Sequence, residues 1–269
     1  MTKRTGLGLA LAALLTMPSM AAAQQGDDWC ERNRNWSSDR AEFCEVRELT
    51  MGSGGSLGVD ASPNGGISVE GAARSDVHVR ARVTATAETE GRAREIAAAV
   101  RVQPAGDRLE SDGPTGLGRR ESWSVSYRLT VPRQMGLDLK TVNGGISVRD
   151  VEGRIEFETN NGGVNLAGVG GDVRGRTTNG GVSVDLEGPA WQGEGLDVET
   201  SNGGVTIAVP DGYSARLEAG TVNGGLRSDF PTTADADGRR RRSFEATLGS
   251  GGAPIRVRTS NGGVRIRRK

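Results

Sequence analysis

Aromatic residues, histidine, lysine and long apolar runs are all scarce in this sequence. Only 4% of the 269 residues are aromatic and 35% are hydrophobic, whereas 42 are glycine. Conventional globular cores contain more large apolar side chains, so a chain of this composition is either flexible or built from short strands and tight turns. The periodic placement of valine and isoleucine described below favours the second possibility.

The single histidine limits the chemistry that this chain can support. With only His78 present, a metal site made of several histidines is excluded, and a Ser-His-Asp triad would have to use His78 itself. His78 lies on the polar side of an expected strand, so we predict that it is a surface residue. The sequence also contains no Gly-x-Ser-x-Gly and no P-loop motif. We therefore expect no catalytic residues, no metal site and no cofactor.

No apolar run is long enough for a transmembrane helix, but the chain begins like an exported protein. Lys3 and Arg4 precede an apolar stretch over residues 7–15, and three alanines occupy positions 21–23. A membrane-spanning helix needs about 18 or more apolar residues, so we interpret residues 1–23 as a secretory signal peptide cleaved before Gln24. We expect a periplasmic or extracellular protein with no transmembrane segment after cleavage.

Net charge gives the protein no general attraction to nucleic acid or to anionic membranes. The chain has 34 basic and 34 acidic residues, and two of the basic residues, Lys3 and Arg4, belong to the predicted signal peptide. Lysine occurs only at positions 3, 140 and 269, so nearly all of the positive charge is arginine. Because the two signs nearly balance, we expect no nucleic-acid partner.

The chain has two cysteines, Cys30 and Cys44. In an exported protein a disulfide is the default, and loop-closure entropy would make it worth about 3 kcal/mol. The bond would close a segment that carries Trp29 and Trp36 and otherwise shows little pattern. The spacing is not Cys-x-x-Cys, which argues against a redox or metal-binding pair. We expect residues 24–50 to form a disulfide-closed N-terminal segment.

What the sequence has in abundance is one motif, Asn-Gly-Gly. Aliphatic residues alternate on both sides of it, and this period of two predicts strands with one buried face. From Asn143 onward, successive asparagines are 18, 18, 23, 21 and 38 residues apart, a period near 20 that is typical of repeat proteins. The motif occurs seven times, at Asn64, Asn143, Asn161, Asn179, Asn202, Asn223 and Asn261. The first copy departs from the pattern, with Pro63 inserted before the asparagine.

Two architectures explain this repeat, an antiparallel meander of hairpins and a β-solenoid. Asn-Gly is a strong hairpin signal because both residues tolerate a positive φ. In a solenoid of roughly 20-residue coils, residues at equal distance before the asparagine become neighbours about 4.8 Å apart. Their charges mostly alternate from coil to coil, as in the series Lys140, Glu158, Arg176, Glu199, and this favours stacking. We therefore predict an all-β solenoid in which each Asn-Gly-Gly supplies left-handed backbone at a corner.

The region before the repeat has a different pattern. Apolar residues alternate over 77–83 and 123–131, which predicts two longer strands, while residues 104–120 look like loop. Between the strands, apolar residues at helical spacing predict one helix at about 89–100, capped by Thr89. Because solenoids need covered ends, we interpret residues 51–136 as an N-terminal cap and residues 137–269 as the repeat.

Two groups of arginines stand out near the C-terminus. The segment 231–242, inserted in the last repeat, contains Arg239, Arg240, Arg241 and Arg242. This loop either binds a polyanion such as lipopolysaccharide or teichoic acid, or is a solvated loop that nearby aspartates neutralise. The chain then ends with Arg265, Arg267, Arg268 and Lys269, and such charge on an exposed last strand is typical protection against edge-to-edge association.

Carboxylates at the outward positions of the repeat leave an enzymatic alternative open. Glu156, Glu158, Asp197 and Glu199 resemble in placement the carboxylates that glycan-processing β-helix enzymes cluster on one face. Arginines interleave with them at the same positions, as structural ion pairs would. We expect the protein not to be an enzyme.

The Thr-x-Asn-Gly-Gly-aliphatic units from Thr141 to Ile266, with the lead-in "VSYRLTVP…LDLKTVNGG", resemble a bacterial β-strand-repeat family of unknown function whose members are called putative adhesins. The resemblance covers roughly residues 55–269. It implies a right-handed, single-stranded β-helix outside the cytoplasm, associated with the cell envelope, and it supplies no catalytic residues. Our hypothesis is a non-enzymatic envelope protein that binds a cell-surface polymer or an envelope protein. The alternatives are a glycan-processing enzyme and a purely structural role through end-to-end stacking of coils.

Overall fold

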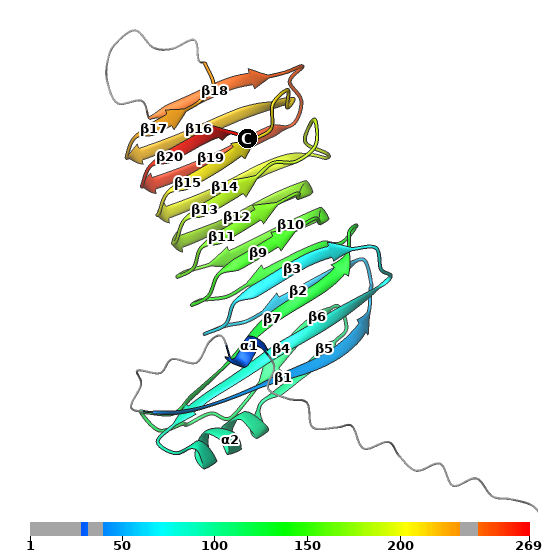
Figure 1. Ribbon diagram of the computed structural model, residues 1–269, viewed down its shortest axis with the longest axis vertical. Coiled ribbons are helices and arrows are strands. Elements are labelled where there is room, and N and C mark those ends of the chain that lie inside the picture. The colour runs from blue at the N-terminus through cyan, green and yellow to red at the C-terminus, as the bar shows by residue number, and fades with distance from the viewer. Residues whose placement is uncertain (1–27, 32–39, 232–241) are drawn as a thin grey trace, which may run out of the picture.

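The described part of the chain is mainly β-structure, with two short helices. The computed structural model describes residues 28–31, 40–231 and 242–269. The predicted signal peptide, Trp36 and Arg239–Arg241 lie outside the described residues. Twenty strands form two ten-stranded sheets, which we call sheet A and sheet B. Figure 1 shows them as an elongated stack, with the longer strands and both labelled helices at the N-terminal end.

Each repeat unit places its first strand in sheet B and its second strand in sheet A. Both strands pair in parallel with the same strands of neighbouring units. The strands on the two sides of an Asn-Gly-Gly therefore lie in different sheets, and the hairpin meander is wrong for this region. The units are β8 (Gly136–Lys140) with β9 (Ile146–Arg149), β10 (Glu152–Thr159) with β11 (Val164–Ala167), β12 (Gly170–Asn179) with β13 (Val182–Asp185), β14 (Gly195–Asn202) with β15 (Val205–Val209), β16 (Ala215–Asn223) with β17 (Leu226–Ser228), and β19 (Pro254–Asn261) with β20 (Val264–Arg268).

The space between the sheets is filled by the alternating aliphatic residues. Those facing inward, such as Ile155, Val173 and Ile207, have no exposed surface. Among these aliphatic positions, Phe157 carries an aromatic ring. The ring fills the space that a side chain at Gly175 would need, because a Cβ there would lie 2.4 Å from it. The glycine that interrupts the aliphatic pattern thus makes room for the aromatic ring of the neighbouring unit.

The stacking order of the units departs from their order in the chain. The C-terminal unit, β19 with β20, lies between β14–β15 and β16–β17. Strand β18 (Ser243–Leu248) then pairs antiparallel with β16 and ends sheet B. Because β20 has a partner on each side, the expectation that the last strand is an exposed edge protected by its charges is wrong. The edge of sheet A at this end is β17 instead.

At the other end, the first Asn-Gly-Gly belongs to the same stack despite its unusual sequence. It connects β2 (Ser56–Asp60) in sheet B to β3 (Ile67–Ala72) in sheet A, and these pair in parallel with β8 and β9. Sheet A continues with β7 (Ser122–Pro132), β4 (Asp76–Ala87) and β1 (Ala41–Gly52). The two longer strands predicted from alternation are β4 and β7. Strand β1 has no clean alternation, because both of its faces are partly covered.

The predicted helix is α2 (Glu90–Ala99), and Thr89 caps it as expected by accepting a hydrogen bond from the backbone nitrogen of Arg92 at 3.3 Å. Its buried residues are Ala93, Ile96 and Ala97. Arg47 of β1 donates to the carbonyl oxygen of Ala97 at 2.8 Å and so satisfies the helix C-terminus. The other helix is the short α1 (Asp28–Glu31).

Part of the region predicted as loop is a hairpin. Strands β5 (Arg101–Ala105) and β6 (Arg108–Asp112) pair antiparallel across Gly106, which has a φ of 65°. Strand β6 also pairs with β2, so the hairpin continues sheet B at its N-terminal end. Leu109 is the main side chain that the hairpin buries. A single buried residue makes no alternating pattern, so the sequence does not predict strands here.

Candidate binding surfaces

The seven Asn-Gly-Gly segments form a ladder of side-chain amides. In every unit after the first, the asparagine Nδ2 donates to the Oδ1 of the asparagine in the preceding unit of the stack, at 2.7–2.9 Å. Each inner rung therefore makes two hydrogen bonds, one as donor and one as acceptor. The rungs follow the order Asn64, Asn143, Asn161, Asn179, Asn202, Asn261, Asn223.

A second ladder runs beside it and is made by the threonines two positions earlier. Each hydroxyl donates to the carbonyl oxygen of the first glycine in the preceding unit, at 2.7–2.9 Å. These bonds satisfy carbonyl groups that the neighbouring unit covers. The threonines are Thr141, Thr159, Thr177, Thr200, Thr259 and Thr221 in stack order, and all are buried.

The glycines are needed for space rather than for left-handed backbone. No residue of any Asn-Gly-Gly has a positive φ, so the expectation that the motif supplies left-handed backbone is wrong. A Cβ on the first glycine, as at Gly162, would lie 1.9 Å from the carbonyl oxygen of Gly144 in the preceding unit. The same contact recurs at 1.9–2.1 Å in the other repeat units. Close stacking of backbone on backbone explains why this position is always glycine.

The outer face of sheet B carries the alternating charges, and we call it the charged face. The predicted neighbours are confirmed by the register: Glu158 lies opposite Lys140 and Arg176, and Arg176 lies opposite Glu199. Arg176 donates to Glu158 at 2.8 Å, and this hydrogen bond, with the charge of Glu158, raises the pKa of Arg176 above its ordinary value. The charged face comprises Asp138, Lys140, Glu156, Glu158, Arg174, Arg176, Asp197, Glu199, Arg256 and Arg258.

The intercalated C-terminal unit continues this alternation. In chain order, Asp197 would meet Glu218 of β16, a repulsive pair. The actual order inserts Arg256 between them, and Arg256 donates to Glu218 at 2.8 Å. Opposite charges across adjacent strands are favourable by about 0.2–1 kcal/mol. The signs of these charges are the feature of the sequence from which the stacking order could have been inferred.

Three of the four carboxylates that the enzymatic alternative invokes, all but Glu199, are engaged in ion pairs. Glu156 accepts from Arg154 at 2.5 Å, Glu158 from Arg176 at 2.8 Å, and the Asp197 carboxylate lies 3.7 Å from Arg258. They line a shallow groove of about 490 Å³. Arginines therefore occupy carboxylate oxygens that a catalytic acid or base would offer to a substrate.

The outer face of sheet A is different, because its central row is neutral and polar. Adjacent strands place residues opposite one another in the order Ser68, Ser147, Asn165, Ser183, Thr206, which we call the small polar row. Neighbouring strands are about 4.8 Å apart, so hydroxyls and amides recur at that interval. Arg128 stands opposite Ser68 at one end of the row, and Arg265 stands opposite Thr206 at the other.

At the C-terminal end of this face lie three exposed arginines, Arg227, Arg265 and Arg267, which we call the arginine cluster. Arg227 lies directly opposite Arg265 on the adjacent strand. No carboxylate of the described residues forms an ion pair with any of the three. By contrast, Arg268 pairs with Asp211 at 3.2 Å, and Lys269 pairs with Asp185. Sequence reasoning assigned Arg265, Arg267, Arg268 and Lys269 to edge protection and did not single out Arg227, and so missed the arginine cluster.

The arginine-rich loop is only partly within the described residues. Of the four predicted arginines, Arg242 alone is described; it is exposed, and its carbonyl oxygen accepts from the backbone nitrogen of Thr221 at 2.8 Å. The loop leaves β17 and returns to β18, which places both of its ends at the same end of the molecule as the arginine cluster (Figure 1).

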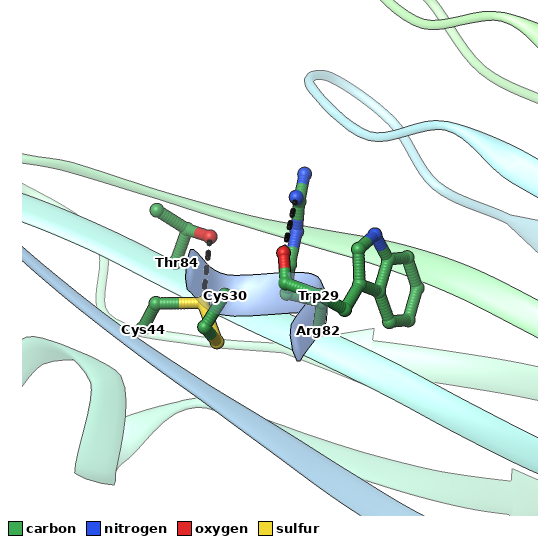
Figure 2. The surroundings of a disulfide bond; sticks show 5 residues. All are labelled: Trp29, Cys30, Cys44, Arg82 and Thr84. Carbon is green, nitrogen blue, oxygen red and sulfur yellow. Dashed lines mark hydrogen bonds between the residues drawn. A yellow bond between two sulfur atoms is a disulfide. The ribbon is translucent and has the colours of Figure 1, made fainter. Parts of the chain in front are cut away.

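The two cysteines form the expected disulfide, Cys30–Cys44, with Cα atoms 5.8 Å apart. It attaches α1 to β1 and holds Trp29 against sheet A (Figure 2). The guanidinium carbons of Arg128 and Arg82 lie 4.0 and 5.2 Å from the centre of the indole. Arg82 also donates to the carbonyl oxygen of Trp29 at 3.4 Å.

The remaining predictions concern His78, metal sites and membrane-spanning helices. His78 is partly exposed on β4, with its Nε2 3.7 Å from a carboxylate oxygen of Glu48. Among the described residues, no group of three or more His, Cys, Asp or Glu side chains is placed to hold a metal ion. Neither of the described helices is long and apolar enough to cross a membrane.

Several solved structures show a distant similarity in fold. A putative cell adhesion protein from Clostridium sporogenes covers 84% of this chain and 100% of its own, with 10% identity and a TM-score of 0.42. A putative adhesin from Bacteroides fragilis covers 84% and 97%, with 10% identity and a TM-score of 0.40. A putative lipid binding protein from Parabacteroides distasonis covers 83% and 97%, with 10% identity and a TM-score of 0.35.

No curated protein matches the sequence. A protein-family match covers residues 64–267, from the first Asn-Gly-Gly to the last strand, and so contains all of the repeat units described above. The resemblance seen in the repeat motif is therefore confirmed, and the chain belongs to the Toastrack DUF4097 family.

Proposed function

We propose that this protein is a non-enzymatic binding protein of the cell envelope, and that the outer face of sheet A binds an anionic surface polymer. The observation that carries the proposal is the arginine cluster. Three exposed guanidinium groups lie on one face, and none forms an ion pair with a carboxylate of the described residues. A polymer with repeated negative charges would engage all three together.

The cost of this arrangement supports a binding role. Like charges directly opposite on adjacent strands are destabilising, and Arg227 lies opposite Arg265. On the outer face of sheet B, acidic and basic side chains alternate and neutralise one another. The same fold could therefore have placed acidic residues beside the arginine cluster. Positive charge left without a local acid raises the concentration of an anionic partner near the surface.

Along the same face, the small polar row offers the polymer uncharged hydrogen-bonding side chains. Its five residues follow one another from β3 to β15 without a carboxylate among them. Ser, Thr and Asn side chains donate and accept hydrogen bonds, which suits a chain rich in hydroxyl groups. The asparagine and threonine ladders hold the strands, and so the row, at a fixed spacing. Binding would therefore cost little conformational entropy in the protein.

The proposal includes the architecture and location of the protein. We infer that the units form a right-handed, single-stranded β-solenoid, supported by their alternation between two sheets and by parallel pairing throughout the repeat. Export through a signal peptide over residues 1–23 is supported by the sequence and by the disulfide between Cys30 and Cys44. The expectation from the sequence that Arg239–Arg242 bind a polyanion belongs to the same proposal.

Co-sedimentation tests the proposed function. The protein from Gln24 onward is mixed with isolated cell-wall sacculi or with outer-membrane vesicles, at low and at high salt. The wild type should pellet with one of them at low salt only, because exposed charges are screened at high salt. The triple variant Arg227→Gln, Arg265→Gln, Arg267→Gln should remain in the supernatant.

A matched variant controls for net charge. Replacing Arg154, Arg174 and Arg258 by Gln removes three exposed positive charges from sheet B. This variant should pellet like the wild type. Equal pelleting of wild type and both variants, or no pelleting of the wild type with either fraction, would overturn the polymer-binding proposal.

A further inference from the structure

A hollow on the outer face of sheet A, at the end opposite the arginine cluster, has the properties of a small-molecule site. Its volume is about 430 Å³, within the range of roughly 300–1,000 Å³ typical of ligand pockets. We call it the Trp29 pocket. The residues that matter to its chemistry are Trp29, Arg82, Arg128, Ser68, Ser147 and Asn165.

The wall of the Trp29 pocket depends on the disulfide. Helix α1 has only four residues, and the bond between Cys30 and Cys44 joins it to β1 directly beside Trp29 (Figure 2). The indole is only 7% exposed, although it stands on the outer side of the sheet. A tryptophan attached in this way closes one side of the hollow.

Two guanidinium groups concentrate positive charge at the wall. Arg82 and Arg128 lie on the adjacent strands β4 and β7, and both contact the indole. Burial, together with the charge of Arg128, lowers the pKa of Arg82, while the charge of Glu42 opposes this change. Two cations that repel each other in a partly desolvated place are stabilised by an anionic ligand.

The floor of the Trp29 pocket is the N-terminal part of the small polar row. Ser68, Ser147 and Asn165 lie opposite one another on β3, β9 and β11. They offer two hydroxyls and one amide at intervals of about 4.8 Å. Hydroxyl groups on opposite sides of one sugar ring are separated by a similar distance. The floor is made of short side chains, which leaves room for a flat ligand against the sheet.

We propose that the Trp29 pocket binds an acidic saccharide, with the carboxylate of a uronic acid toward Arg82 and Arg128 and the sugar hydroxyls on Ser68, Ser147 and Asn165. A planar carboxylate matches the fork of a guanidinium group, and hydroxyl groups match the floor. This site is separate from the arginine cluster. Its floor is shared with the small polar row, but its affinity for a short saccharide does not depend on polymer binding at the cluster. A plain ion site would not need the three neutral hydrogen-bonding residues.

Isothermal titration with tetragalacturonate tests the proposal, with maltotetraose as the neutral analogue. The wild type should bind the acidic sugar, and the neutral sugar should bind at least tenfold more weakly because the charge-assisted bonds are missing. Asn165→Ala, which removes a floor group from an exposed position, should weaken binding of tetragalacturonate about fivefold. Arg128→Gln should weaken it more than tenfold.

Controls separate binding from folding and from the first proposal. Ser183→Ala changes the next member of the small polar row, which does not line the pocket, and should bind like the wild type. The arginine-cluster variant should also bind tetragalacturonate normally. Thermal unfolding checks that each variant is folded, and Asn165→Ala keeps the test valid if Arg128→Gln loosens α1.

Three results would overturn the proposal. They are no binding of tetragalacturonate up to about 10 mM, equal affinity for the neutral sugar, and unchanged affinity in both Asn165→Ala and Arg128→Gln. A sulfated disaccharide that binds as tightly as its uronic-acid counterpart would contradict the carboxylate assignment.

Discussion

The first glycine of each Asn-Gly-Gly is required by a distance. At Gly162, the carbonyl oxygen of Gly144 occupies the place where a side chain would begin. Gly225, the second glycine of the unit at the edge of sheet A, has no atom within 4 Å of its hypothetical Cβ. The same residue type is therefore essential at one position of the motif and replaceable at another.

Gly162→Ala should lower the free energy of unfolding by about 3 kcal/mol, because two units must move apart to admit the methyl group. Gly225→Ala should change it by less than about 0.5 kcal/mol. Urea unfolding followed by circular dichroism measures both. Equal effects of the two substitutions would contradict the steric explanation.

The buried threonines predict a smaller loss. Thr159 donates to the carbonyl oxygen of Gly144 at 2.9 Å, and Thr159→Val keeps the shape while leaving that oxygen without its donor. The free energy of unfolding should fall by about 1–2 kcal/mol. Thr206→Val is the matched control, since Thr206 points outward and its hydroxyl forms no hydrogen bond with other described residues. If the control is as destabilising as Thr159→Val, the hydrogen bond is not the cause.

Among elements, the C-terminal unit is the most consequential. Strands β19 and β20 separate β14–β15 from β16–β17, so the end of the chain lies inside the stack. Removing it leaves a gap between two units rather than a shorter stack. The charges agree with this order, because Arg256 stands between Asp197 and Glu218.

A chain that ends at Gly249 tests this order. Backbone amides of β16, β17 and β18 should lose hydrogen-exchange protection, because their partner β19–β20 is gone, while β10 to β13 keep theirs. Retained protection in β16–β18 would mean that these strands can pair directly with β14–β15. The intercalated unit would then be dispensable.

Many of the helices and strands, and the register between strands, could be predicted from the sequence. The period of apolar residues, the helix cap and the order of charges are all local signals. Thr89 marked the start of α2, and alternation marked β4 and β7. The register of the charged face followed from equal spacing before each asparagine. Two features could not be predicted, because they depend on contacts between segments distant in the chain. The β5–β6 hairpin has little apolar pattern of its own. The β19–β20 unit could have stacked either between β14–β15 and β16–β17 or beyond β16–β17.

The candidate sites were harder to predict than the fold. Arg227 and Arg265 stand four residues after their asparagines, so equal spacing makes them neighbours whether or not the last unit is intercalated. The stacking order decides instead that Arg265 lies opposite Thr206, at the end of the small polar row. The Trp29 pocket joins α1, β7 and β11, which are more than a hundred residues apart at the extremes. Only the disulfide of this group could be expected from the sequence.

At the scale of the whole molecule, two buried tyrosines predict sensitivity to alkali. Burial raises the pKa of both Tyr127 and Tyr213 to about 12, above the value of about 10 for an exposed tyrosine. Between these values the unfolded chain loses the phenol protons and the folded chain keeps them. Stability should therefore be unaffected below pH 10 and should fall as the pH rises from 10 to 12.

The midpoint of urea unfolding at pH 9, 10 and 11 measures this loss. Tyr127→Phe and Tyr213→Phe together should flatten the decline. An equally steep decline in the double variant would assign it to other groups.

The two faces of the stack differ in a way that bears on function. The charged face neutralises itself through pairs such as Arg176 with Glu158, whereas the arginine cluster has no such pairs among the described residues. Since one face is neutralised and the other carries the arginine cluster at one end, an anionic partner has a defined side to bind. The central claim is that this side is the binding surface.

The affinity of the purified protein for long-chain polyphosphate, measured over a range of salt concentrations, tests that claim most directly. This polymer carries charge without sugar, and any contribution of Arg82 and Arg128 in the Trp29 pocket is the same in the wild type and in the arginine-cluster variant. The logarithm of the binding constant should fall linearly with the logarithm of salt concentration, as it does for nucleic acids. In the variant with Gln at positions 227, 265 and 267, the slope should be smaller by about two to three, as expected when three phosphate contacts are lost. An unchanged slope and affinity in that variant would show that the arginine cluster is not the binding surface.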